Sequence, residues 1–193
     1  MENVITYNKH PYDKMKMVDL ENESEEMKWA ILDYHNQDFV LNGIVNNTPF
    51  TPEGHADFLA KYPYMRRRQY IVYYNNRAIG KISVTPISDD EYDDLGCYLF
   101  HKEDLHKRLG MLVMSFAYHY LFDVRKAKKI KYDIRKINKN SQRISISLGC
   151  KIISENNDRF NMECSYDDYK KRISNIDGEL AEFFAADANV ISL

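Results

Sequence analysis

The chain has 193 residues, of which 44% are hydrophobic and 29% are charged, and its formal net charge is −2. This size supports one globular domain with its own core, and the near-neutral charge excludes a general attraction to nucleic acid or to an anionic membrane. No stretch reaches the roughly 18 apolar residues that span a bilayer, and the N-terminus lacks an apolar signal-peptide core, so we expect a cytoplasmic protein.

The three cysteines, Cys97, Cys150 and Cys164, are far apart and include no Cys-x-x-Cys pair. That spacing argues against a disulfide framework and against a zinc site. We therefore expect half-buried free thiols in a reducing compartment, and no metal.

The first elements expected after a polar or strand-like lead-in over residues 1–10 are two helices. Apolar residues recur at helical spacing over 23–40, and either Asn22 or Ser24 is a suitable cap for the start of that helix. Thr51 is a good N-cap and Pro52 suits the first helical turn, which predicts a second, shorter helix from Pro52 to about residue 62.

A β-hairpin and then alternating strands and helices are expected next. The hairpin has strands over 69–74 and 78–85 around the turn sequence Asn75-Asn76-Arg77. The later elements are an acidic loop over 88–92, a strand over 95–100, a helix over 111–122, a strand over 129–134, a helix over 140–148 and a hairpin with strands over 151–154 and 159–166.

This order predicts a mixed sheet in a single α/β or α+β domain over residues 1–168. The tail over 169–193 begins polar and ends apolar. Three interpretations of the tail stay open: a helix, an oligomer contact that would make the protein a homodimer, or partial disorder.

A basic loop lies between the strand over 95–100 and the apolar helix that follows it. The free amides and the positive dipole end of a helix N-terminus can hold a phosphate. Gly110 would allow backbone to approach an anion closely, and Lys107 and Arg108 add positive charge. The loop is thus a candidate phosphate site, or else a solvated basic turn.

The segment from Asn138 to Lys151 carries the clearest motif. Asn138-x-x-Ser141-x-Arg143-Ile144-x-x-x-Leu148-Gly149-Cys150-Lys151 resembles the signature of the GNAT N-acetyltransferase superfamily. The strand over 94–99 and the loop over 105–110 resemble that family's cofactor strand and pyrophosphate loop, in the same order. The resemblance covers roughly residues 20–166.

The resemblance implies the GNAT fold, with a central, mostly antiparallel sheet splayed between its fourth and fifth strands. It also implies acetyl-CoA as acyl donor, with the pantetheine arm lying in that gap. The residues that it assigns to acetyl-CoA are Tyr98, Leu99 and Phe100 for the pantetheine amides, Leu105, His106, Lys107, Arg108, Leu109, Gly110 and Met111 for the pyrophosphate, and Asn138 and Ser141 for the far end of the arm or the adenosine.

The acceptor side resembles that of nucleotide-sugar N-acetyltransferases of the pseudaminic-acid pathway type. Tyr34-His35-Asn36 and the later Thr51-Pro52-Glu53-Gly54-His55 match their entry helices. The resemblance therefore implies that Tyr34, His35 and His55 line the acceptor site, and it favours a small-molecule primary amine such as an amino sugar.

The chain also departs from the family pattern at the proposed site. Leu105 and Arg108 replace an Arg or Gln and a glycine of the pyrophosphate loop, and Arg108 enters the left-handed region less cheaply than glycine. Ser145 stands at the usual acid tyrosine, so the leaving thiolate would take its proton from Ser145, from water or from a tyrosine elsewhere. Cys150 replaces the customary Phe.

Asp133 and Asp94 are the candidate general bases, because strand-end carboxylates can take an amine proton through water. The mechanism that the resemblance implies is direct transfer in a ternary complex. Two other functions stay open: acetylation of a protein N-terminus or lysine, and a catalytically silent module that binds CoA or a protein.

Overall fold

The computed structural model describes residues 4–186. Within them, eight strands form one sheet in the order β1-β2-β3-β4-β5-β6-β8-β7, antiparallel except for the β5–β6 pair. The strands are β1 (Val4–Thr6), β2 (Met15–Asp19), β3 (Arg68–Tyr74), β4 (Arg77–Pro86), β5 (Glu91–Leu99), β6 (Lys129–Arg135), β7 (Lys151–Glu155) and β8 (Arg159–Ser165).

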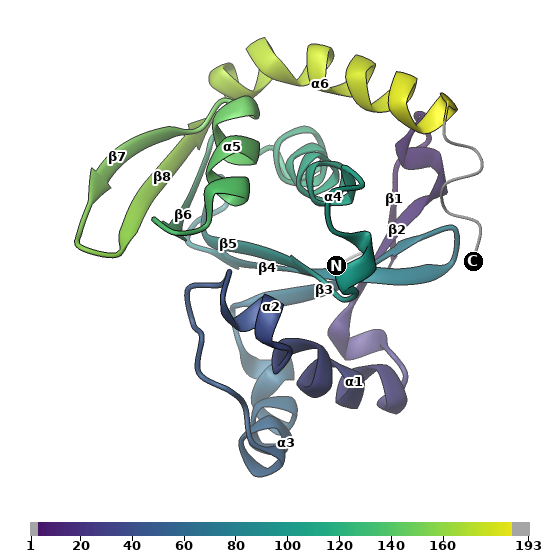
Figure 1. The fold of residues 1–193 in the computed structure, drawn as a ribbon, viewed down its shortest axis with the longest axis vertical. Coiled ribbons are helices and arrows are strands. Elements are labelled where there is room, and N and C mark those ends of the chain that lie inside the picture. Colours follow the sequence, from purple (N-terminus) through teal and green to yellow (C-terminus); the bar gives the residue numbers. More distant parts are fainter. Residues whose placement is uncertain (1–3, 187–193) are drawn as a thin grey trace.

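Helices cover both faces of the sheet (Figure 1). One face carries α1 (Glu25–His35), α2 (Asp38–Leu41) and α3 (Pro52–Lys61). The other carries α4 (Leu109–Tyr118), which continues into the π-helical turn η5 (His119–Val124), together with α5 (Lys139–Ser147) and α6 (Tyr166–Ala186). Short 3₁₀ turns are η1 (Tyr12–Lys14), η2 (Leu20–Asn22), η3 (Tyr62–Tyr64) and η4 (Lys102–Asp104).

Two hydrophobic cores hold the three layers together. The larger core packs α4 and α6 on the sheet and includes Val72, Ile82 and Phe116, and the smaller core packs Ile31 of α1 against Ile71 of β3. Each such fully buried aliphatic or aromatic side chain stabilises the fold by about 1.5–3 kcal/mol relative to an exposed one. The sheet is therefore fixed from both sides.

The helix starts follow the capping residues of the sequence. Ser24 accepts from the Met27 amide at 3.2 Å, Thr51 from the Gly54 amide at 3.1 Å, and Asn138 from the Ser141 amide at 3.0 Å. Each side chain satisfies one of the free donors in the first turn. The predicted starts of α1, α3 and α5 are correct to within two residues.

The single helix predicted over 23–40 is wrong, because the chain breaks between α1 and α2. Asn36 ends α1, and its side chain donates to the Phe50 carbonyl at 2.9 Å and accepts from the Phe50 amide at 2.8 Å. These bonds to a distant segment replace helical bonds, and Gln37 then takes an extended ψ of 136°.

The strands also differ from the prediction at two places. β5 begins at Glu91, inside the predicted acidic loop, because Asp93 pairs with Thr85 and Tyr92 with both Pro86 and Ile130. β2 is an additional strand whose side chains alternate between buried and half-buried positions. Pairing with neighbouring strands thus overrides the low strand propensity of acidic residues.

The C-terminal segment forms the long helix α6 as far as Ala186, whereas residues 187–193 lie outside the described part. Its side chains Ile173, Ile176, Leu180 and Phe184 are buried in the larger core. None of the helices within residues 4–186 is long and apolar enough to cross a lipid bilayer.

Candidate active site

The strands β5 and β6 diverge soon after they meet. Their parallel pairing includes only Glu91 with Lys129 and Tyr92 with Ile130. Farther along β5, Ser83 of β4 pairs with Gly96 and Thr85 with Asp93, so two residues of β5 oppose one of β4. Such a β-bulge bends a strand, and Asp94 in the bulge has a left-handed φ of 60°. The bulge turns β5 away from β6.

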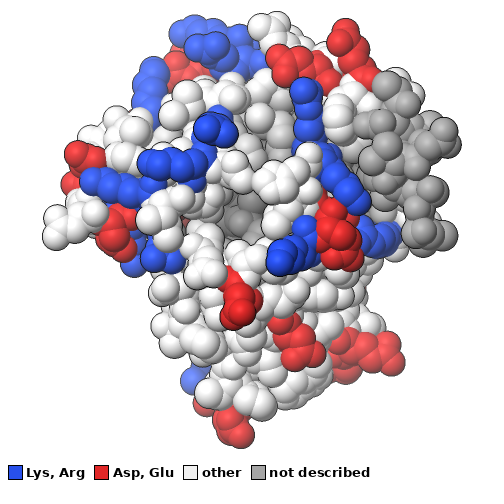
Figure 2. All heavy atoms as spheres, in the orientation of Figure 1, with Lys and Arg blue, Asp and Glu red and all other residues white. Residues whose placement is uncertain are grey.

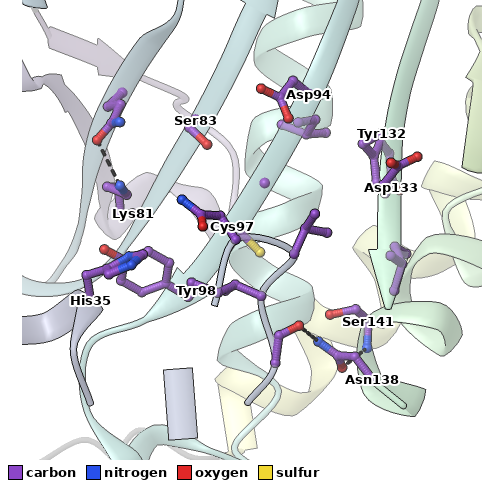
Figure 3. Close-up of a pocket in the computed structure, with 18 of the residues that line it drawn as sticks. His35, Lys81, Ser83, Asp94, Cys97, Tyr98, Tyr132, Asp133, Asn138 and Ser141 are labelled. Carbon is purple, nitrogen blue, oxygen red and sulfur yellow. Dashed lines mark hydrogen bonds between the residues drawn. The ribbon is translucent and has the colours of Figure 1, made fainter. Parts of the chain in front are cut away.

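A cavity of about 490 Å³ occupies this gap and extends below the sheet toward α1 and α3. Figure 2 shows the face hollowed near its centre, with Lys and Arg side chains around the opening. Figure 3 shows Lys81 and His35 on one side of the gap and Asp133, Asn138 and Ser141 on the other. The cavity therefore joins two chambers, one on each face of the sheet.

The chamber on the α4 side is mostly apolar, and one wall is backbone of β5 that pairs with β4 but has no partner on the side of β6. Leu95, Gly96, Cys97 and Tyr98 of β5 form one wall. Burial raises the pKa of the Cys97 thiol to about 12, so it stays protonated and is a poor nucleophile. The other walls are Met114 of α4, Tyr132 and Ile134 of β6, and Ser141, Ile144 and Ser145 of α5.

The loop before α4 keeps the backbone of a glycine-rich turn without its glycines. His106 has φ 67° and Arg108 has φ 55°, both left-handed. Each costs roughly 1–2 kcal/mol for an L-residue, and such strain concentrates at functional turns. The free amides at the start of α4 follow directly, and Gly110 brings the helix close to Ile144 of α5, whose Cδ1 would lie 3.5 Å from an added Cβ.

The side chain of Arg108 points to the C-terminal helix. Its guanidinium lies 4.9 Å from the ring centroid of Phe183 in α6, a cation–π contact. Arg108 adopts the left-handed conformation although this costs more than for glycine. The contact with Phe183 helps to hold the loop in that conformation.

The chamber on the α1 side is polar and has aromatic walls. Arg67, Gln69, Lys81 and Ser83 lie on or beside β3 and β4. His35 stacks on Phe50 with ring centroids 3.6 Å apart and lies 3.2 Å from the Thr48 carbonyl through Nε2. Burial lowers the pKa of His35, so its ring is neutral at pH 7.

In this chamber Arg67 has a carboxylate partner, whereas the hydrogen-bond partner of Lys81 is a neutral amide. Arg67 forms a salt bridge with Asp94 and donates to Ser83 Oγ at 2.8 Å. Lys81 donates to Gln69 Oε1 at 2.8 Å and lies 5.1 Å from the Tyr98 ring centroid. Burial, and then the nearby Arg67 charge, lower the pKa of Lys81 to about 7.

The predicted bases and acid all line the cavity. Asp133 accepts from Asn161 at 2.8 Å and lies 3.9 Å from Arg159. Asp94 is held by Arg67, and Ser145 is a buried residue of α5. The structure thus places all three residues in the lining of one cavity, where each of the two carboxylates already lies within salt-bridge distance of an arginine.

A second hydroxyl lies beside Ser145. Tyr132 of β6 lines the cavity, and its hydroxyl lies 2.8 Å from that of Tyr118 and 3.0 Å from the Cys150 sulfur. Desolvation, followed by the Cys150 contact, raises the pKa of Tyr132 well above its usual value, whereas hydrogen bonds with Ser145 and Tyr118 act in the opposite direction. The phenol therefore stays protonated.

Some predicted site residues lie outside the cavity lining. Tyr34 stacks on Phe100 at 4.1 Å, and His55 contacts the Lys28 carbonyl at 2.8 Å. The Phe100 amide donates to Ile79 O, and its carbonyl accepts from Gln37, which leaves the part of β5 before Leu99 to face the gap. His35, Tyr98, Asn138 and Ser141 do line it.

Sequence reasoning missed several polar groups of the cavity, among them Arg67, Gln69, Lys81 and Tyr132. One signal was present for Lys81. It lies in a hairpin strand with alternating apolar and polar residues, Ile79 to Thr85, where a charged residue facing a helix-covered side is unusual. The sequence alone does not show that helices cover that side.

Comparison with known proteins identifies the architecture. No family model and no curated protein sequence matches this chain. Solved structures do match: the Campylobacter jejuni N-acetyltransferase PseH has 18% identity and a TM-score of 0.63, and the match covers 79% of this chain and 98% of that one. The chain has the GNAT acetyltransferase fold.

Two further solved structures are similar to this chain. The spermidine N-acetyltransferase from Vibrio cholerae has 12% identity and a TM-score of 0.68, with coverage of 81% of this chain and 98% of that one. An uncharacterized protein from Bacillus halodurans has 11% identity and a TM-score of 0.77, with coverage of 92% and 97%. The predicted splay between the fourth and fifth GNAT strands is present here between β5 and β6. The strand numbers differ by one because β2 is an additional strand before them.

Proposed function

We propose that the protein is an acetyl-CoA-dependent N-acetyltransferase for a primary amine on a small molecule. One observation carries the proposal: the gap between β5 and β6 opens beside a loop that holds two non-glycine residues, His106 and Arg108, in left-handed conformations. Unpaired strand edges fit an extended amide-containing arm, and converging loop amides fit a pyrophosphate. The GNAT fold of the neighbouring structures supports this proposal.

Bound acetyl-CoA would supply the acetyl thioester in this gap. The backbone of Leu95 to Tyr98 forms the proposed arm site, whereas Leu99 and Phe100, which the resemblance also assigned to it, lie outside the cavity lining. The amides of His106, Lys107, Arg108, Leu109, Gly110 and Met111 form the proposed pyrophosphate site, with Asn138 and Ser141 beside it, whereas the Leu105 amide already donates to the Lys102 carbonyl at 3.1 Å. Asn138 already uses both ends of its side chain within the protein, so its role there is to hold the wall in place.

The segment over 42–50 forms part of the wall of the chamber on the α1 side, which favours a small acceptor over a protein chain. The segment over 42–50 is tied down at both ends: Arg135 donates to Asn42 O at 3.2 Å and Asn138 to Gly43 O at 2.8 Å, and Asn36 holds Phe50. With its aromatic and polar walls, the chamber suits a ring with hydroxyl groups. An amino sugar of a nucleotide sugar is the acceptor that we favour, and PseH, an N-acetyltransferase, is among the similar structures.

The residues around the gap can serve direct transfer in a ternary complex. The bulge takes Leu95 out of the β4 ladder, and we assign backbone N–H groups of this region to the carbonyl oxygen that gains charge. Tyr132, protonated and next to Ser145, is the group that we assign as proton donor to the departing sulfur. Asp133, Asp94 and Ser145 stay candidates for acid–base roles.

The test has two steps. Calorimetric titration of the purified chain with acetyl-CoA should show saturable binding, and thiol release should then depend on an added amine from a panel of amino sugars, nucleotide amino sugars, polyamines and peptides. No detectable heat at millimolar acetyl-CoA would refute the proposal. Binding without turnover on any amine would instead favour the silent module, and turnover on peptides alone would favour a protein acetyltransferase.

A further inference from the structure

Lys81 is an unusual residue for the middle of a helix-covered sheet. It is 7% exposed and lies on β4, with Ile71 of β3 and Tyr98 of β5 as its partners across the two ladders. A buried ammonium costs several kcal/mol unless an anion compensates it. Within residues 4–186 no carboxylate lies within salt-bridge distance of Lys81, and its recorded contacts, Gln69 and the Tyr98 ring, are neutral.

Among the charged and titratable groups around Lys81, the Arg67 charge makes protonation of the lysine still less favourable. Arg67 contributes a positive charge to the same wall, partly balanced by its salt bridge to Asp94. His35 faces it from α1, and the phenol of Tyr98 is buried and protonated. Figure 3 shows Lys81 beside the cavity, with its hydrogen bond dashed.

We infer that Lys81 is the group that takes the proton from the acceptor's ammonium, and this inference rests on the proposed acetyltransferase function. Asp94 and Asp133, the carboxylates of the same cavity, are each engaged by an arginine. Lys81 is the cavity's basic side chain whose recorded partners leave its nitrogen lone pair free when it is neutral. It acts from the chamber where the acceptor would lie.

The protons balance with Lys81 in this role. Neutral Lys81 and the acceptor R–NH₃⁺ give Lys81–NH₃⁺ and R–NH₂, which is then able to form the new N–C bond as the C–S bond breaks. The nitrogen's second proton ends on the departing thiolate, by way of Tyr132 or water. Lys81 returns its proton to solvent before the next turnover, and no oxidant or reductant takes part.

The pKa of Lys81, lowered to about 7, agrees with this role. At pH 7, Lys81 would then be neutral in about half of the protein molecules, whereas an exposed lysine with a pKa near 10.4 would be charged in almost all of them. General bases work best with a pKa close to the working pH, and a positioned base contributes typically 10²- to 10⁴-fold to the rate.

The experiment compares Lys81→Met and Lys81→Arg with the control Lys16→Met. Lys16 of β2 makes a similar cation–π contact, 4.9 Å from the Tyr73 ring centroid, but does not line the cavity. We expect both Lys81 variants to lose at least about 100-fold in kcat while acetyl-CoA affinity measured by calorimetry stays within about threefold. The acidic limb of the wild-type kcat/KM profile near pH 7 should disappear in Lys81→Met.

Arginine is the informative substitution, because it retains the charge but cannot act as a base at neutral pH. If Lys81→Arg kept wild-type kcat, the side chain would serve to bind an anion or hydroxyl of the acceptor, and the inference would be overturned. NMR titration of the wild-type lysine amine tests the same point without a substrate, and a midpoint above about pH 9 would also overturn it. A wild-type chain that neither binds nor turns over acetyl-CoA would instead show that the proposed function is wrong.

Discussion

The side-chain amide of Asn138 forms one hydrogen bond in the wall of each chamber of the cavity. Its oxygen accepts from the Ser141 amide at 3.0 Å and caps α5, while its Nδ2 donates to the Gly43 carbonyl at 2.8 Å. The first bond belongs to the wall of the gap, and the second belongs to the segment that closes the acceptor chamber. One residue therefore fixes the position of both.

Replacing Asn138 by Ala should lower the free energy of unfolding by about 1–3 kcal/mol, since it removes an N-cap and a second hydrogen bond. Urea denaturation measures the change. Asn140→Ala, at an exposed position of the same helix, is the control and should stay within about 0.5 kcal/mol. Equal stability of the two variants would show that the cap and the tether contribute nothing.

Gly149 after α5 should be intolerant of a side chain. Its φ is 101°, and an added Cβ would lie 2.7 Å from the Asp168 carbonyl oxygen. We expect Gly149→Ala to destabilise the fold by at least about 2 kcal/mol. Gly178→Ala is the matched control: an added Cβ meets nothing within 4 Å in α6, so we expect stabilisation of up to about 1 kcal/mol by helix propensity.

Because His106 in the loop before α4 has a left-handed φ, we expect two substitutions at this exposed residue to change stability in opposite directions. His106→Gly relieves the left-handed strain, so the fold should gain up to about 1 kcal/mol and acetyl-CoA affinity should stay within about threefold. His106→Val should destabilise the loop and weaken acetyl-CoA binding at least about tenfold, because a β-branched residue disfavours positive φ. Unfolding and calorimetric titration together decide; equal affinities for both variants would show that this backbone conformation is not needed for binding.

Tyr132→Phe should reduce kcat about 10- to 100-fold with acetyl-CoA affinity unchanged, if its phenol donates the proton to sulfur. The control is Tyr118→Phe. Tyr118 belongs to the same hydroxyl–thiol cluster, 2.8 Å from Tyr132, but it does not line the cavity. Should both variants lose activity equally, the cluster would matter through structure alone, and steady-state kinetics with thiol detection will distinguish these outcomes.

Acid should loosen the attachment of α6. Burial tends to raise the pKa of Asp177, but hydrogen bonds from His119, Lys9 and Tyr12 outweigh it and hold the pKa below its usual value. The pKa of Asp123, which accepts hydrogen bonds from Tyr169 and His119, is lowered in the same way.

A depressed folded-state pKa contributes stability that is present above the unfolded value, near 3.9, and is lost as the pH falls through the folded value. Asp177→Asn should therefore cost about 2–3 kcal/mol at pH 7 and progressively less below pH 4. Urea denaturation at pH 7, 5 and 3.5 measures this; a difference that does not change with pH would exclude the electrostatic origin.

The local part of the fold was predictable because it depends on neighbouring residues. Thr51, Asn138 and Gly149 act at helix ends through bonds and dihedral angles within a few positions, and the hairpin turn at Asn75 and Asn76 has both residues at positive φ, as its sequence predicts. The mixed sheet followed from the order of these elements, and the GNAT fold followed from the resemblance carried by the motif at Asn138. The break at Asn36 did not, because its partner Phe50 lies in a distant segment.

By itself, then, the sequence determined most of the elements, the cap at Thr51 and the motif at Asn138, all of which rest on short-range chemistry. Only the tertiary structure decided where β5 leaves β6, that Lys81 lies in the cavity without an anion, and that Tyr132 lies beside Ser145. Each of these depends on strand register and on which helices cover which face, and those are set by pairing between residues far apart in the chain.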